Sequence, residues 1–86
     1  MDTALKNRFM HRLSLSTERI ENLSKTIIDL ASNPNGFCAT EQISAYSVRL
    51  AECIAERNGI CVALDLFGYH VKWENEKPVA IEEITE

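Results

Sequence analysis

The sequence has few residues that interrupt secondary structure or that could form disulfide bonds. Its 86 residues include 3 glycines, 2 prolines and 3 cysteines. The cysteines, Cys38, Cys53 and Cys61, are odd in number and lack CxxC spacing, which argues against a disulfide framework or a structural zinc site. We expect the glycines at two turns and one helix end, so none remains for a phosphate-binding loop. No cofactor or metal site is therefore predicted.

Long hydrophobic runs are also lacking. No apolar run approaches the roughly 20 residues that cross a bilayer, and the first residues, MDTALKNRFMHRL, lack the apolar segment of a secretory signal. A composition of 45% hydrophobic and 26% charged residues is typical of a globular protein. We therefore expect one small domain over residues 1–86, located in the cytoplasm and not in a membrane.

Positive charge is scarce overall and unevenly placed. The formal net charge is −4; the start of the chain is basic, and residues 74–86 carry five glutamates against one lysine. An acidic balance disfavours binding to nucleic acid, because phosphate contacts need clustered lysine and arginine. It favours a protein partner with a basic face. The alternative is that the glutamates only keep this end of the chain soluble.

Residues 3–32 have the periodicity of an amphipathic helix. Their apolar stripe contains Phe9, Leu13, Ile20, Leu23, Ile27 and Leu30. Ser16 interrupts this stripe and could cap a second helix, so one helix and two helices are both open. A single helix would be about 45 Å long at 1.5 Å per residue. Because this exceeds what a small sheet covers, the overhang predicts a homodimer through the N-terminal helix.

A further helix is expected over residues 40–58. Thr40 suits its N-cap and the Asn58-Gly59 pair suits its end, while residues 33–36 form the preceding turn. One side carries the apolar stripe Ile43, Tyr46, Leu50, Cys53 and Ile54. Beside it runs a ridge of small residues, Ser44, Ser47, Ala51 and Ala55. This helix therefore offers two contact surfaces, one for the sheet and one for another helix or a partner.

Residues 60–84 alternate in character like a three-stranded antiparallel meander. Gly68 and Tyr69 suit a type II′ turn, which would pair Leu64 with Trp73. A second loop centred on Glu76 would pair Trp73 with Val79, Val71 with Ile81, and His70 with Glu82. The predicted fold is α+β, with two helices, or three if residues 3–32 form two, packed on one face of this meander.

The same register places Cys61, Asp65 and His70 on the open face of the sheet. Nucleophilic catalysis would need the thiol within hydrogen-bond reach of a base. Cys61 and His70 are about 10 Å apart at roughly 3.4 Å per residue. Asp65 and His70 also have ordinary partners across the ladder, in Lys72 and Glu82. The sequence therefore predicts a protein that is not an enzyme and has no catalytic residues.

The predicted function is a small acidic regulator, adaptor or inhibitor that binds another protein through the open sheet face and the acidic C-terminal strand. Aromatic residues ringed by charge are typical of protein interfaces. The candidate partner-binding residues are Phe67, Tyr69, His70, Lys72, Glu74, Glu82, Glu83 and Ile84. A special case is a protein of the kind that mobile elements encode, whose carboxylates imitate nucleic-acid phosphates.

Two alternatives remain. The order helix, turn, helix and hairpin resembles the layout of winged-helix DNA-binding domains, with residues 40–58 as the recognition helix. That resemblance implies a DNA-binding regulator, but Glu52 and Glu56 lie among the arginines of the would-be reading face. The second alternative is a structural homodimerisation module.

Overall fold

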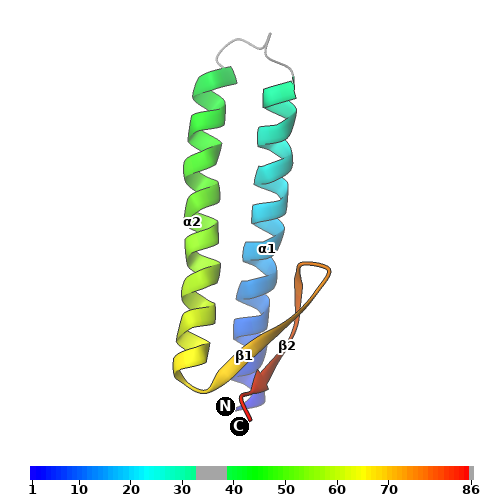
Figure 1. Ribbon diagram of the computed structural model, residues 1–86, viewed down its shortest axis with the longest axis vertical. Helices are drawn as coiled ribbons and strands as arrows, with labels where there is room; N and C mark the ends of the chain where they lie inside the picture. Colours follow the sequence, from blue (N-terminus) through cyan, green and yellow to red (C-terminus); the bar gives the residue numbers. More distant parts are fainter. Residues whose placement is uncertain (33–38, 86) are drawn as a thin grey trace.

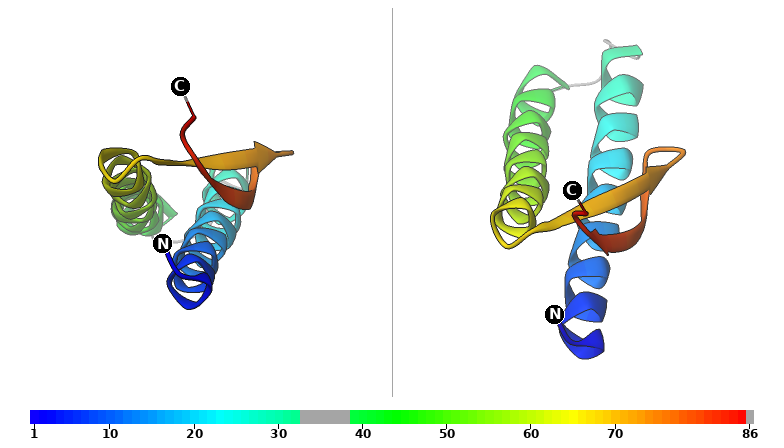
Figure 2. Two further views of the ribbon diagram at one scale, coloured as in Figure 1. Left: turned by 90° about the horizontal axis from the view of Figure 1, so that it is seen from below. Right: turned by 60° about the horizontal axis from the view of Figure 1, so that its bottom comes forward.

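The computed structural model describes residues 1–32 and 39–85. Its elements are α1 (Thr3–Ser32), α2 (Ala39–Leu66), β1 (Tyr69–Glu74) and β2 (Lys77–Glu83). The helices lie antiparallel and side by side, in a molecule of 53 × 24 × 20 Å (Figure 1). The hairpin lies across one side of both helices near the start of α1, with β1 against α2 and β2 against α1 (Figure 2). The α+β class and a sheet covered by helices on one face are confirmed.

Helix α1 is continuous. It begins beside Asp2, whose Oδ1 accepts a hydrogen bond of 2.7 Å from the backbone N–H of Leu5. The break considered at Ser16 does not occur, and a third helix is not seen in the described residues. Ser16 is buried instead, in phase with Leu13 and Ile20. Because no glycine or proline interrupts this segment, the helical stripe continues through it.

Helix α2 is longer than predicted, and this is the main correction to the predicted fold. It does not end at Asn58-Gly59 but continues to Leu66, so the first predicted strand is helix and the sheet has two strands. Continuation keeps Ile60 and Leu64 in phase with Cys53 and buries Leu64. A glycine within a helix costs only about 1 kcal/mol. The further turns and the buried leucine outweigh that cost.

Gly68 ends α2 rather than opening a hairpin. Its φ is 85°, and its N–H donates a hydrogen bond of 3.0 Å to the carbonyl of Asp65. A left-handed glycine directly after the last turn is a common helix ending. The predicted type II′ turn at Gly68 and Tyr69 is therefore wrong, and Tyr69 begins β1. The pairing of Leu64 with Trp73 is wrong for the same reason.

The predicted loop centred on Glu76 is confirmed in its position, between β1 and β2. Asn75 and Glu76 have φ of 51° and 65°, as in a type I′ turn, whose twist matches that of the strands. The predicted pairs Val71 with Ile81 and His70 with Glu82 are confirmed. The pair Trp73 with Val79 is wrong. An irregularity after Lys72 sets Trp73 opposite Pro78 instead.

The core is small and lies at the hairpin end of the molecule. Its buried apolar residues are Leu13 of α1, Leu64 of α2 and Ile81 of β2. Phe9, Met10, Ile60, Cys61, Tyr69 and Val71 pack around them. Toward the end of α1 and the start of α2, the two helices cover only each other, and residues such as Leu23 and Leu50 stay half-buried. The predicted turn at residues 33–36 and the cysteine at position 38 lie outside the described residues.

Neither α1 nor α2, over the described ranges, combines the length and the apolar composition needed to cross a membrane.

Candidate protein-binding site

The predicted partner-binding residues do not share one surface. His70 and Lys72 point outward from β1, and His70 Nε2 lies 3.3 Å from Glu82 Oε2 across the hairpin. Tyr69 lies on the opposite, helix-facing side. Its hydroxyl accepts a hydrogen bond of 2.7 Å from the amino group of Met1, and Lys6 Nζ lies 5.9 Å from its ring centroid.

The other predicted residues are divided between the two ends of the hairpin. Phe67 follows the last residue of α2 and is strongly exposed, so it is not part of the sheet. The N–H of Ile84 donates a hydrogen bond of 2.8 Å to the carbonyl of Gly68, which places Ile84 at the same end. Glu83 is paired with Tyr69 at that end, and Glu74 lies at the turn, opposite Lys77. The predicted surface is therefore a charged outer ladder and a separate apolar end.

The residues weighed for catalysis do not share the sheet face that the sequence predicted for them. Cys61 and Asp65 belong to α2, whereas His70 belongs to β1 and pairs with Glu82. Across the residues that the structure describes, no three histidine, cysteine, aspartate or glutamate side chains gather as a metal site.

An open groove of about 680 Å³ lies beside the hairpin tip, where α1, α2 and the β-turn meet. We call it the tip groove. Its apolar lining comprises Ile20 and Ile28 of α1, Cys61 of α2 and Trp73 of β1. Ile28 is 62% exposed and Trp73 is 38% exposed. Exposed apolar side chains around a hollow are typical of a surface that another molecule covers.

Electrostatic contacts position the groove wall. The Arg57 guanidinium carbon lies 5.6 Å from the ring centroid of Trp73, within the range of a cation–π contact. This contact fixes the indole against α2. The rim of the groove carries charges of both signs, from Glu21, Lys25, Glu76 and Lys77. The rim therefore suits a partner with mixed charge better than a polyanion.

Thr17 contributes a buried polar atom to the groove. The residue is 9% exposed, and its Oγ1 has no hydrogen-bond partner among the described residues. A buried hydroxyl without a partner costs about 1–3 kcal/mol. An occupant that brings a polar group to this position would remove that cost.

Cys61 lines the groove as a half-buried thiol. Burial raises the pKa of the Cys61 thiol, and the nearby Arg57 charge partly opposes this shift. The folded chain therefore favours the protonated thiol. Because a free thiol titrates near pH 8.5, alkylation of Cys61 at about pH 8.5 should be slower in the folded chain than in urea.

The raised pKa of Cys61 also sets the direction in which the free energy of unfolding changes with pH. The stability that the protonated Cys61 contributes is present below the pKa of the unfolded thiol, and it is lost as pH rises through the raised pKa of the folded chain. Alkylation rates with iodoacetamide, followed by peptide mass spectrometry against pH, would measure the shift. Equal rates for Cys61 in folded and unfolded chains near pH 8.5 would contradict it.

Comparison with models of protein families, with curated proteins and with solved structures finds no match to this chain. Sequence reasoning missed the groove because its walls come from three elements. The available signal was a second stripe on α1, formed by Ile20, Ser24 and Ile28, which are spaced by four.

Proposed function

We propose that the chain is a small non-enzymatic protein-binding regulator or adaptor, and that its tip groove receives an amphipathic helical segment of another protein. The observation that carries this proposal is the exposure of Ile28 and Trp73 on the same groove, with the unpaired hydroxyl of Thr17 in its wall. An apolar anchor with a nearby hydrogen-bonding group is how proteins commonly hold a partner segment.

The shape of the groove favours a helix as the occupant. Its α1 wall runs from Thr17 to Ile28, which is about 16 Å or three helical turns. Beyond the hairpin tip, no part of the described ranges 1–32 and 39–85 forms a third layer over α1 and α2 (Figure 1). A third helix laid there would cover Ile28 and complete a three-helix arrangement. The rim glutamates and lysines would meet the polar edges of that helix.

The alternatives have less support. A winged-helix protein crosses its recognition helix against the preceding helix, at about 90–120°, whereas α1 and α2 lie antiparallel along their length (Figure 1). The mixed charge of the groove rim does not favour duplex DNA either. Binding of a basic protein to the charged outer ladder of the hairpin, with Phe67 and Ile84 as the apolar end, is the second candidate.

Selection of helical peptides would test the proposal and separate the two candidate surfaces. The probe is a displayed library of amphipathic helical peptides, and binding is read from the fluorescence of Trp73, the single tryptophan. The matched variants are Ile28→Glu in the groove and Ile84→Glu at the apolar end, both at exposed isoleucines. We expect Ile28→Glu to weaken peptide binding at least ~10-fold, because it places a charge on an interface anchor.

Ile84→Glu should leave the affinity of the selected peptides unchanged. Thr17→Val should weaken binding while keeping the fold, because it removes the hydroxyl and keeps the shape. If Ile84→Glu abolishes binding and Ile28→Glu does not, the site moves to the apolar end of the hairpin. If no peptide is selected, or if Trp73 fluorescence does not respond, the proposal is wrong.

A further inference from the structure

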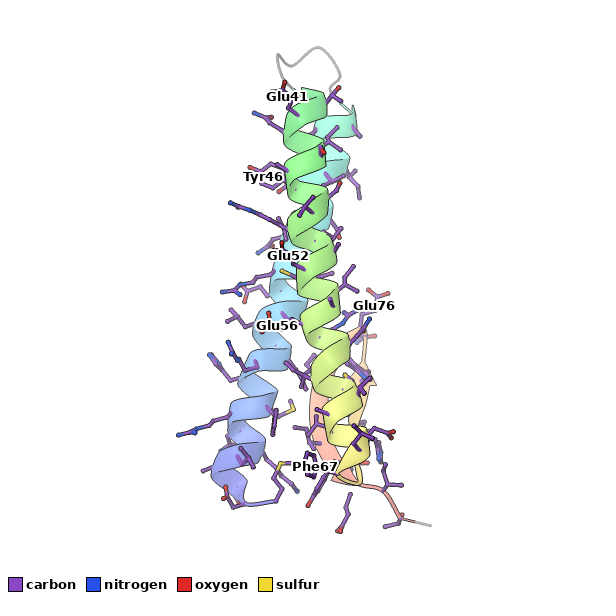
Figure 3. The ribbon with its side chains drawn as sticks, turned by 90° about the vertical axis from the view of Figure 1, so that its left-hand side faces the viewer. Glu41, Tyr46, Glu52, Glu56, Phe67 and Glu76 are labelled. Carbon is purple, nitrogen blue, oxygen red and sulfur yellow. The ribbon has the colours of Figure 1, made fainter. Side chains whose placement is uncertain are left out.

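Helix α2 carries apolar residues on two opposite sides, and among the described residues α1 and the hairpin cover only one of these sides. The side turned away from α1 carries Ser44, Val48, Ala51, Ala55, Gly59, Val62 and Leu66, which we call the outer face. All seven residues are exposed and none is charged. Val48 is 57%, Val62 59% and Leu66 80% exposed. Figure 3 views α2 from this side, with α1 behind it and Glu56 at one edge. An apolar helix face is normally buried against another element.

The accessible surface of the chain is larger than that of a compact monomer of the same mass. The chain of 9.7 kDa exposes 6333 Å². A compact monomer of this mass exposes about 5,100 Å². The excess of roughly 1,200 Å² is larger than the area of about 800 Å² that each partner contributes to a standard interface. One interface of ordinary size would therefore cover about two thirds of this excess.

The outer face is symmetric about Ala55. Ala51 and Gly59 lie four residues to either side, and Val48 and Val62 lie seven. Ser44 and Leu66 lie eleven to either side. A two-fold axis beside Ala55 would bring Val48 onto Val62 of a second copy, and Ala51 onto Gly59 of a second copy. The same patch is then complementary to itself, as a two-fold interface requires.

Gly59 has no evident role within a single chain. A Cβ added at Gly59 would meet nothing within 4 Å, and the residue lies inside α2 without a positive φ. Glycine at such a position costs about 1 kcal/mol relative to alanine. Small side chains at Ala51, Ala55 and Gly59 would let a second helix approach to about 8 Å, the close end of helix packing. Close approach by another helix explains the glycine.

We propose that two copies of the chain pair through the outer faces of α2, antiparallel and with Ala55 at the two-fold axis. This goes beyond the proposed function, because the tip groove lies on a different side of α2. Cys61 of the groove lies about 120° around the helix from Ala55 at 100° per residue. The grooves therefore stay open in the dimer. A two-fold axis perpendicular to the helices places both grooves on the same side of the assembly.

Sedimentation equilibrium of the full chain tests the pairing. We expect a monomer–dimer equilibrium for the natural sequence. Ala55→Arg, which sets two arginines against each other at the axis, should raise the dimer dissociation constant roughly 100-fold or more. The matched control is Ala45→Arg, an exposed alanine of the same helix about 80° away from Ala55. It should leave the dissociation constant nearly unchanged.

A cross-linking experiment covers the case in which Ala55→Arg fails to fold. Chains with Val48→Cys are mixed with differently tagged chains with Val62→Cys, and the mixture is oxidised. The natural chain, oxidised in the same way, shows how much cross-linking its own cysteines cause. The antiparallel pair predicts disulfides between the two variants. Two copies of Val48→Cys would lie about 21 Å apart along the axis and should not link. A monomer at all concentrations, a dimer that survives Ala55→Arg, or preferential linking of Val48→Cys to itself would overturn the proposal.

Discussion

Replacing Leu64 with alanine is expected to lower the free energy of unfolding by about 2–5 kcal/mol, the cost of a cavity at a fully buried leucine. Leu64 is 1% exposed and belongs to the core cluster with Leu13 and Ile81. Few other residues are available to compensate, because the cluster is so small. A chain of this size has a total stability of only about 5 kcal/mol or somewhat more. The variant should therefore be only marginally stable, with a clearly lower melting temperature.

Leu66→Ala is the matched control, two positions along the same helix. Leu66 is exposed in the single chain, so its loss should cost less than about 0.5 kcal/mol when measured at concentrations that keep the chain monomeric. Urea denaturation followed by circular dichroism gives both values. A strand over these residues would place Leu64 and Leu66 on one buried face. Equal and large losses for both variants would therefore contradict the helical continuation.

Ile81→Asp should be the other strongly destabilising change, at about 4 kcal/mol or more, because it puts an unpaired carboxylate into an apolar core. Ile81 is the buried residue of β2 and is paired with Val71. Its loss should detach the hairpin from both helices. The exposure of Trp73 would then rise, which shifts its fluorescence to longer wavelength. Thermal unfolding with this probe measures the effect.

Val79→Asp controls for the introduction of a charge into β2. Val79 lies in the same strand but is exposed. It should cost much less than Ile81→Asp and should leave the Trp73 fluorescence unchanged. If Ile81→Asp keeps both the melting temperature and the fluorescence of the natural chain, the hairpin does not hold the core as described.

Much of the fold was predictable because its signals are local and repeated. The apolar stripe of α1 continues from Phe9 to Leu30, over about six turns, with Leu13 and Ile20 as clear members. The hairpin between Val71 and Ile81 was predictable because a polar turn separates two alternating segments. Both predictions depend on periodicity over many residues, which is the most reliable sequence signal.

The segment ICVALDL was ambiguous in physical terms. It alternates at Ile60, Val62, Leu64 and Leu66, but Cys61 and Ala63 between them are also apolar, and a short apolar run fits a strand or a helix. The pair Asn58-Gly59 is also typical of a helix end, which favours the strand interpretation. This local preference is worth about 1 kcal/mol. Burial of Leu64 against α1 and β2 outweighs it, and the sequence alone did not show which elements would meet there.

The candidate site was less predictable than the fold. Sequence reasoning chose Phe67 and the outer residues of the sheet because it placed Phe67 in a strand. The tip groove needs Trp73 beside Arg57, and this contact forms only when α2 continues beyond residue 59. The apolar outer face has the same origin, since Val62 and Leu66 join Val48 only on a continuous helix. The tip groove and the outer face were therefore both missed because residues 60–66 were predicted as a strand and are helical.

The core, the tip groove and the outer face all require that α2 continues through Gly59 to Leu66. The most direct test is assignment of the backbone and nuclear Overhauser effects of residues 57–66 by NMR. We expect helical Cα shifts and sequential amide contacts through Leu66, with contacts from Leu64 to Leu13 and Ile81. Extended shifts over these residues, with cross-strand contacts between Leu64 and Trp73, would contradict the helix and every surface built on it.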